Sequence, residues 1–251
     1  MKISRTTCTA FVAAATTSAS AFSIQSSGGR SFVTRATSLV NKSRFPVSKS
    51  VQKGGAHMTM LFGNLFGGGA YNSKIDYQNL DHPGPELATA AEAGLVLSVS
   101  DKDSNLKLAT FAGGCFWGLE LAYQRVPGVV YTGVGYAQGP EESPSYEQVC
   151  SGSTGHTEAV IVYYDPKECS YESLLDCYFD RIDPTTVNGQ GGDRGTQYRT
   201  GVYFHSPEQE AVAKARFEQE APKFRKPIAS ELKAAAPFWP AEKYHQQYLE
   251  K

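Results

Sequence analysis

The first 75 residues of this 251-residue chain contain no aspartate or glutamate. They hold nine of the 24 lysines and arginines, whereas all 25 acidic residues follow, so a formal net charge of −1 hides two oppositely charged parts. A net charge near zero does not favour a nucleic-acid-binding protein. Every apolar run is shorter than the roughly 18 residues of a membrane span, so the sequence does not favour a membrane protein. The chain also has no CxxC pair, so zinc-ribbon and thioredoxin-like sites have no support.

The acid-free leader is typical of a targeting sequence. A basic tip precedes a short apolar run at 10–15 and an A-x-A pattern at 19–21, where a signal peptidase would cut. We therefore predict a presequence over 1–60, signal-like over 1–21 and transit-like over 22–60. It resembles the bipartite plastid presequences of algae with secondary plastids. A plain transit peptide, for plastid or mitochondrion, and simple secretion are the alternatives.

The rest of the chain reads as one globular domain with an N-terminal addition. Glycine and proline clusters in 61–104 indicate a linker or N-terminal extension with one short helix. Over 105–251 we expect strands at 108–112, 129–136, 159–164, 202–204 and 228–232, and helices at 115–125, 171–182, from 207, and 241–249. This order indicates an α+β fold, a two-layer sandwich with a mixed sheet and a split βαβ, ferredoxin-like core.

Cys115 is the candidate nucleophile, because it follows a strand and two glycines and begins a helix. Free N–H groups and the helix dipole favour a thiolate, so we expect a pKa below the usual value of about 8.5. Phe116 and Trp117 come next and suggest a substrate group with an apolar end. The alternatives are a small buried residue, a dinucleotide loop whose glycine spacing does not fit, and a Cys/His hydrolase using His156.

Four blocks of sequence carry a family resemblance. They are Gly114-Cys115-Phe116-Trp117-Gly118, Gly155-His156-Thr157-Glu158-Ala159, Gly195-Thr196-Gln197-Tyr198-Arg199 and Tyr244-His245-Gln246-Gln247-Tyr248-Leu249. In this order they resemble the signature blocks of peptide methionine sulfoxide reductase A, over 106–249. The resemblance implies reduction of methionine (S)-sulfoxide, free or in proteins, as repair of oxidative damage, through a cysteine sulfenic acid and without metal or organic cofactor. A non-catalytic redox sensor or sulfoxide-binding module is the alternative.

The resemblance assigns the two central roles to Cys115 and Glu158. The thiol would attack the sulfoxide sulfur, and Glu158 would protonate the departing oxygen, which requires burial to raise its pKa. The plainer interpretation of Glu158 is an acid at a strand edge. We expect His156 to be a structural hydrogen-bonding residue and Arg199 to pair with a nearby acid.

The same resemblance implies a substrate pocket. Tyr146 and Tyr198 would direct phenolic O–H groups to the sulfoxide oxygen, and Asp193 would orient this network. Phe116 and Trp117 would contact the methyl group on sulfur. The tyrosines could instead be core residues, and Asp193 a turn former.

Cys115 must be regenerated after one turnover. Many family members use cysteines in a C-terminal tail, but no cysteine follows Cys177 here. Either Cys150, Cys169 or Cys177 resolves the sulfenic acid, with Cys150 the possible resolving residue because it lies four residues after Tyr146, or an external thiol does so. We favour an external thioredoxin- or glutaredoxin-like reductant and expect a monomer.

Overall fold

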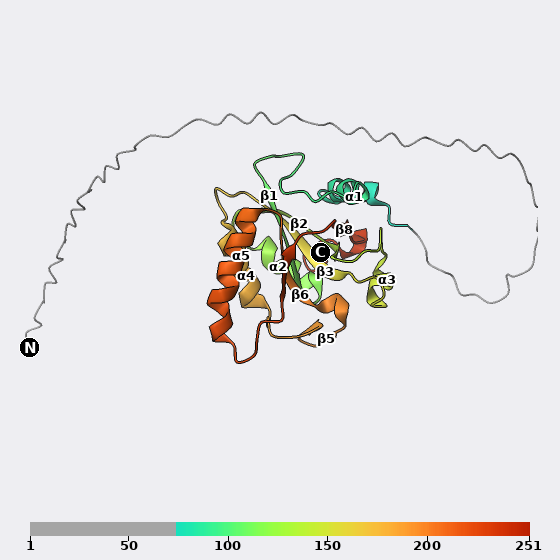
Figure 1. Ribbon diagram of the computed structural model, residues 1–251. Coiled ribbons are helices and arrows are strands. Elements are labelled where there is room, and N and C mark those ends of the chain that lie inside the picture. The colour runs from blue at the N-terminus through green and yellow to red at the C-terminus, as the bar shows by residue number, and fades with distance from the viewer. Residues whose placement is uncertain (1–73) are drawn as a thin grey trace, which may run out of the picture. The chain divides into compact units, whose positions relative to one another are not determined.

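A computed structural model describes residues 74–251 and centres on a six-stranded mixed sheet in the order β7-β6-β1-β3-β2-β8 (Figure 1). The strands are β1 (Lys107–Gly113), β2 (Val129–Ala137), β3 (Thr157–Tyr164), β6 (Thr200–Phe204), β7 (Glu231–Ala234) and β8 (Trp239–Pro240). All neighbours pair antiparallel except β6 and β7. A separate two-stranded hairpin joins β4 (Gly189–Gln190) to β5 (Asp193–Arg194).

Helices connect these strands. They are α1 (Gly84–Glu92), α2 (Phe116–Gln124), α3 (Tyr146–Cys150), α4 (Tyr171–Arg181) and α5 (Pro207–Glu220), with short 3-10 helices η1 (Tyr77–Asn79), η2 (Thr196–Tyr198), η3 (Ala221–Lys223) and η4 (Lys243–His245). Because β3 lies between β1 and β2, the unit β1-α2-β2 is a split βαβ, and β3-α4-β6 repeats the pattern around β1. The predicted α+β class is confirmed. None of the helices between residues 74 and 251 is long and apolar enough to cross a membrane.

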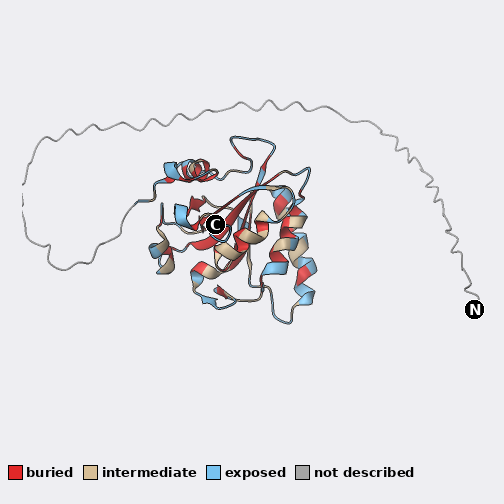
Figure 2. Ribbon diagram, turned by 180° about the vertical axis from the view of Figure 1, so that it is seen from behind, coloured by how far each residue is buried: buried red, intermediate tan, exposed pale blue. Residues whose placement is uncertain are grey.

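The hydrophobic core lies on both faces of β3, which is buried along its whole length (Figure 2). Its side chains alternate between two clusters, with Val160, Val162 and Tyr164 packed toward α2 and α4, and Ala159, Ile161 and Tyr163 packed with Leu87 of α1. Glu158 is in phase with Val160, since side chains two residues apart share a face of a strand. The carboxyl therefore faces the layer that contains α2.

The segment before β1 packs on the domain. Tyr77, Leu80 and Leu87 are buried, and the Tyr77 hydroxyl hydrogen-bonds to that of Ser143 at 2.9 Å. This packing favours an N-terminal extension over a linker for the described part of 61–104, and the domain boundaries stay a prediction. The presequence predicted over 1–60 lies outside the described residues.

The end of the chain differs most from expectation. The helix predicted over 241–249 is absent, and this region contains only the 3-10 helix η4. The side chain of Gln246 accepts a hydrogen bond from the Val134 N–H and donates one to the Val134 carbonyl, each at 2.9 Å. These bonds hold the segment beside β2 in extended backbone, in place of a helix. The strand expected at 228–232 begins at Glu231.

Candidate active site

Cys115 stands at the start of α2, directly after the turn that ends β1. Gly114 has a φ of +79°, and a Cβ there would lie 2.6 Å from the Cβ of Gln190. Only glycine fits this conformation beside the β4–β5 hairpin. The turn leaves Cys115 half-buried, with its thiol near the backbone N–H groups of Trp117 and Gly118 in the first turn of α2.

The environment of Cys115 nevertheless favours the thiol. Burial raises its pKa, and the carboxylates of Glu158 and Asp193 raise it further, whereas the N–H groups of Trp117 and Gly118 lower it. The expectation of a lowered pKa is therefore wrong for the free protein. A helix N-terminus stabilises a thiolate by only a modest amount, and here desolvation and two negative charges outweigh it.

Glu158 lies beside the nucleophile at the beginning of β3. Its side chain is 1% exposed, and Oε2 accepts the N–H of Phe116, the residue after Cys115, at 3.0 Å. Burial raises the pKa of Glu158 to about 7, the Phe116 hydrogen bond opposes the rise, and Asp193 adds to it. The strand-edge interpretation does not fit so buried a carboxyl. Near neutral pH this group can give up or hold a proton next to the thiol.

Two tyrosines face this pair from short helices. Burial raises the pKa of Tyr198 to about 12, and the charges that add to the rise include those of Glu158 and Cys150. Burial also raises the pKa of Tyr146 well above its usual value, and the neighbouring Cys150 and Glu158 add to the rise. Both phenols therefore remain protonated hydrogen-bond donors over the physiological range.

Cys150 shares these neighbours. Its thiol is half-buried, burial raises its pKa, and the charge of Glu158 adds to the rise. Cys169 is buried in the hydrophobic core, and Cys177 packs against that core from α4. Of the three other described cysteines, Cys150 is thus the one that lies near the residues around Cys115.

A hollow of about 460 Å³ opens beside Cys115. Its lining includes Cys115, Trp117, Arg181, Asp193 and Leu249. Asp193 is exposed on the β4–β5 hairpin, so the hollow reaches the thiol from the side of Trp117 and Asp193. Glu158 and the two tyrosines are not part of the lining.

Phe116 and Trp117 differ in position. Phe116 is 1% exposed and packs against the rings of Tyr136 and His245, whereas the half-buried Trp117 borders the hollow. Of these two aromatic side chains, Trp117 is thus the one that borders the hollow, and Phe116 belongs to the core.

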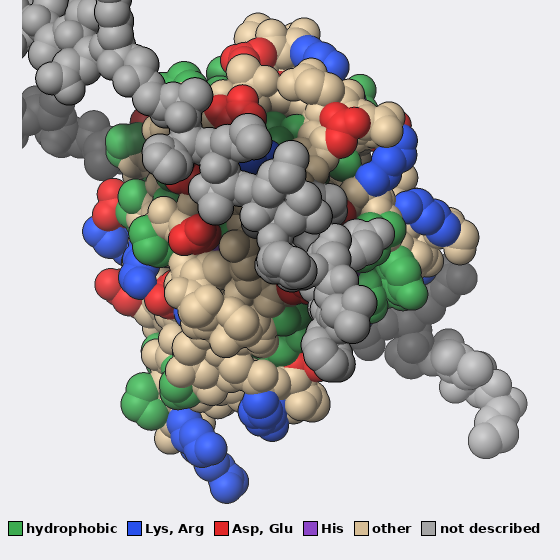
Figure 3. All heavy atoms as spheres, turned by 90° about the vertical axis from the view of Figure 1, so that its right-hand side faces the viewer, with side chains coloured by type: hydrophobic (Ala, Val, Ile, Leu, Met, Phe, Trp, Pro, Cys, Tyr) green, Lys and Arg blue, Asp and Glu red, His purple; other side chains and the backbone are tan. Residues whose placement is uncertain are grey.

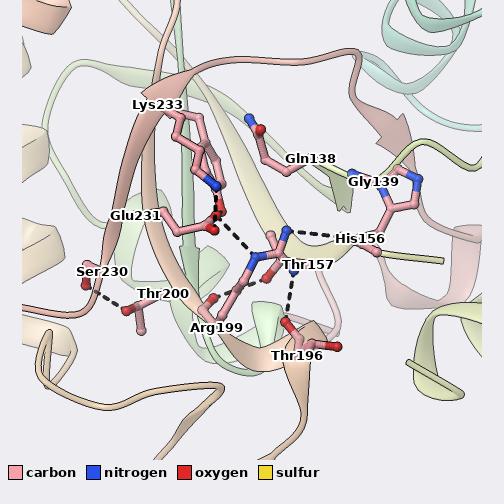
Figure 4. Close-up of polar contacts among 12 residues, drawn as sticks. Gln138, Gly139, His156, Thr157, Thr196, Arg199, Thr200, Ser230, Glu231 and Lys233 are labelled. Carbon is pink, nitrogen blue, oxygen red and sulfur yellow. Dashed lines mark hydrogen bonds and ion pairs between the residues drawn. The ribbon is translucent and has the colours of Figure 1, made fainter. Parts of the chain in front are cut away.

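Arg199 ties the loop before β6 to its surroundings (Figure 4). Its guanidinium hydrogen-bonds to the Glu231 carboxylate at 3.2 Å and to the carbonyls of Thr196 and Gly155 at 3.0 and 3.1 Å. The expected pairing with an acid is confirmed. These three bonds fix the short helix η2, and with it the neighbouring Tyr198.

His156 is a structural residue. Nδ1 accepts the Gly139 N–H at 3.2 Å, and Nε2 donates to the Glu141 carbonyl at 2.7 Å. With both ring nitrogens occupied and burial lowering its pKa, His156 has no free nitrogen to deprotonate Cys115. The geometry gives the Cys/His hydrolase interpretation no support.

Sequence reasoning assigned no role to two residues that support the site. Glu242 accepts the Tyr136 hydroxyl and the Tyr146 N–H, each at 2.9 Å. His245 accepts the indole N–H of Trp117 at 3.2 Å. The signal that could have found them is the fourth block of the resemblance, since both lie in or beside it.

The described residues offer the chemistry of a thiol, a carboxyl and two phenols. Between residues 74 and 251, no group of three or more His, Cys, Asp or Glu is placed to hold a metal ion. On the face drawn in Figure 3, basic and acidic side chains are intermixed, without a broad patch of one sign. The arrangement suits attack by sulfur with proton transfer from a neighbouring acid.

Comparison with known proteins agrees with this arrangement. The chain is 57% identical over 148 residues to peptide methionine sulfoxide reductase A4, chloroplastic, of Arabidopsis thaliana, a match covering 59% of this chain and 57% of that protein. It is 53% identical over 151 residues to peptide methionine sulfoxide reductase MsrA of Methanoculleus marisnigri, covering 59% of this chain and 92% of that protein. The chain thus spans little more than half the length of the plant relative.

A solved structure gives the same result for the fold. Methionine sulfoxide reductase A of Corynebacterium diphtheriae superposes with a TM-score of 0.57 at 36% identity, covering 59% of this chain and 76% of that one. The family model of peptide methionine sulfoxide reductase matches residues 107–251, from the first residue of β1 to the end of the chain. Because that match covers more than half of its residues, the chain belongs to the peptide methionine sulfoxide reductase A family.

Proposed function

We propose that this chain reduces methionine (S)-sulfoxide, free or in proteins, to methionine. The observation that carries the proposal is the pairing of Cys115 with Glu158. The thiol begins α2, and the N–H of the next residue, Phe116, donates to a buried carboxyl whose pKa is raised to about 7. Sulfoxide reduction requires a sulfur nucleophile that can give up its proton and an acid that can deliver one near neutral pH.

The reaction begins when the Cys115 thiol passes its proton to Glu158 and its sulfur attacks the sulfoxide sulfur, which forms a bond between the two sulfur atoms. Glu158 delivers the proton to the oxygen, and the S–O bond breaks so that hydroxide leaves. Hydroxide then attacks the Cys115 sulfur, the bond between the two sulfur atoms breaks, and methionine departs with Cys115 left as a sulfenic acid. Methionine is reduced by two electrons and Cys115 is oxidised by two. Attack and proton delivery belong together because an unprotonated oxide is a poor leaving group.

The surrounding residues would bind the substrate. Tyr146 and Tyr198 donate O–H groups to the sulfoxide oxygen and stabilise its developing charge. Asp193 orients this network from the hairpin beside the hollow. Trp117, supported by Phe116, provides the apolar wall for the methyl group.

An external thiol, from a thioredoxin- or glutaredoxin-like protein, would then restore Cys115. Its thiolate displaces water from the sulfenic acid to form a mixed disulfide, and a second thiol releases Cys115 and an oxidised reductant. The hollow beside Cys115 supports this route because it gives access to the sulfur. Mass spectrometry after one equivalent of substrate, without reductant, should find sulfenic Cys115, and a Cys115–Cys150 disulfide would refute the external route in favour of Cys150.

The test of the function is a multiple-turnover assay of methionine release with dithiothreitol as reductant. An enzyme releases many methionines per chain. The second candidate, a redox sensor or sulfoxide-binding module, releases at most one. A comparison of the two sulfoxide epimers tests the S preference in the same assay.

We propose the plastid as the destination of the chain. The acid-free leader and the chloroplastic designation of the Arabidopsis relative support this. Residues 1–60 fused to a fluorescent protein should direct it to plastids. Accumulation in mitochondria or in the secretory pathway would contradict the proposal.

A further inference from the structure

The end of the chain contacts Trp117 through His245, the last residue of η4, and through Tyr248. The ring of Tyr248 stacks on the indole, with 4.0 Å between centroids and 14° between planes. His245 accepts the indole N–H at 3.2 Å. We call His245, Gln247 and Tyr248 the C-terminal clamp.

A buried carboxyl on α2 holds this clamp. Glu120 follows Trp117 by three residues and is 1% exposed. Its Oε2 accepts the backbone N–H of Gln247 at 2.9 Å, and Oε1 accepts the hydroxyl of Thr132 at 3.1 Å. Glu120 therefore joins the helix that carries Trp117 to the segment that stacks on it. The proposed reaction does not use this carboxyl.

Burial of the Glu120 carboxyl would destabilise the fold without its two hydrogen-bond donors. Burial raises its pKa to about 7, and the hydrogen bonds from Thr132 and Gln247 oppose that rise. A carboxyl removed from water destabilises a fold unless hydrogen bonds replace those of the solvent. Of its two partners, Gln247 is the one that belongs to the C-terminal clamp.

We propose that Glu120 is a positioning residue that keeps the C-terminal clamp on Trp117 and so fixes the indole as the wall for the substrate methyl group. This rests on the proposed function of the site. Leu249, which follows the clamp, lines the hollow together with Trp117, so the clamp ends where a ligand would enter. Loss of the clamp should weaken substrate binding and leave the chemistry at Cys115 intact.

The first test is Glu120→Leu, which removes both acceptors while keeping an apolar side chain in the core. KM for a methionine sulfoxide peptide should rise about tenfold, with kcat within about twofold of wild type, because the lost hydrogen bond serves binding alone. Glu120→Gln should recover part of the loss, since its amide oxygen can accept the Gln247 N–H. An unchanged KM in folded Glu120→Leu would overturn the proposal.

Thr132→Val is the matched control. It removes the other hydrogen bond to Glu120 and leaves the contact with Gln247 in place. KM should stay at the wild-type value. A rise equal to that of Glu120→Leu would assign the effect to general destabilisation and refute a specific clamp.

Deletion of 247–251 tests the clamp even if Glu120→Leu does not fold. The deletion should raise KM about tenfold, and an unchanged KM would contradict the proposal. If Glu120→Leu folds, the two changes combined should add nothing further, as for residues that act through one contact, and additive effects would contradict the proposal.

Tryptophan fluorescence tests the C-terminal clamp without an activity assay. The chain has two tryptophans, so Trp239→Phe leaves Trp117 as the only source of tryptophan emission. In that background, deletion of 247–251 and Glu120→Leu should shift the emission in the same direction, as the indole becomes exposed. The two proposals can fail separately. If the wild-type protein reduces no sulfoxide, the proposed function is wrong. If neither the deletion nor Glu120→Leu shifts the emission of Trp117, the C-terminal clamp is refuted.

Discussion

The two halves of the site are built differently. Cys115 and Glu158 stand at the ends of long elements in the central sheet, where paired β1 and β3 fix the backbone. Tyr146, Tyr198 and Asp193 stand on a five-residue helix, a 3-10 turn and a two-residue strand. The groups that would exchange the proton and oxygen are held by the sheet, whereas those that would bind the sulfoxide oxygen depend on a few side-chain hydrogen bonds.

A few hydrogen bonds hold the short elements that carry the two tyrosines. A capping box of Ser145 and Gln148 starts α3, and Glu242 accepts the Tyr146 N–H. Arg199 fixes η2 beside Tyr198. Substitutions in the sheet-borne half should therefore abolish or strongly slow the reaction, and substitutions in the loop-borne half should weaken it by smaller factors.

The largest effect should come from Cys115→Ser. A hydroxyl at this position is far less nucleophilic than a thiol and cannot form a sulfenic acid. Methionine release should be lost entirely, both in one turnover and with dithiothreitol. The matched control, Cys150→Ser, should retain single-turnover release, and a normal rate in Cys115→Ser would remove the role assigned to that residue.

Glu158→Gln should slow methionine formation about 100-fold or more in a single turnover, the range usual for loss of a general acid. The amide keeps the shape of the side chain and can still accept the Phe116 N–H, so folding should be preserved. Rapid-quench measurement of the first methionine released is the direct test. A near-normal rate would show that the proton comes from elsewhere.

The pH profile gives a finer test of the sheet-borne pair. The reactive form holds one proton shared between the Cys115 thiol and Glu158. Below the Glu158 pKa of about 7 both groups are protonated, so kcat/KM should fall about tenfold per pH unit as the pH drops. Above it kcat/KM should stay level until the raised pKa of Cys115 is approached. In Glu158→Gln the break near pH 7 should vanish, and a break that persists would assign it to another group.

The loop-borne half is tested by Tyr146→Phe and Tyr198→Phe. Each removes one O–H donor and should lower kcat/KM about tenfold, since one hydrogen bond to a developing charge contributes roughly that much. The double variant should lose more than either single variant. Tyr244→Phe is a suitable control because its hydroxyl lies on an exposed side chain of η4. Unchanged kinetics in both single variants would favour core roles for these tyrosines.

The same division separates what the sequence could predict from what it could not. The long elements β1, α2, β3 and α4 follow from the pattern of apolar residues, and α5 begins at Pro207, as predicted, with Ser206 as its N-cap. The sequence analysis missed the five-residue α3 because Pro140 and Pro144 precede it in the polar segment between β2 and β3, and because one of its supports is the distant Glu242. The sequence around 146–150 does not indicate a contact with a residue so far along the chain.

Electrostatics shows the same limit at Cys115. The helix N-terminus is visible in the sequence and led to the expectation of a lowered pKa. The opposing influences are burial by the folded chain and the charges of Glu158 and Asp193, which come from β3 and β5. Likewise, a helical pattern at the chain end gave way to the hydrogen bonds of Gln246 with Val134 on β2. Contacts between distant segments decided both outcomes.

The smallest effect should come from Arg199→Lys, which keeps the charge and loses the forked geometry. A lysine can pair with Glu231 but cannot reach the Thr196 and Gly155 carbonyls at the same time. Tyr198 would then be held less firmly, and kcat/KM should fall about threefold, within the loss expected for one hydrogen bond. In a Tyr198→Phe background Arg199→Lys should have no further effect on kcat/KM, because the hydroxyl that it positions is already absent. An equal loss in both backgrounds would show that Arg199 acts on the sheet and not through the loop-borne half.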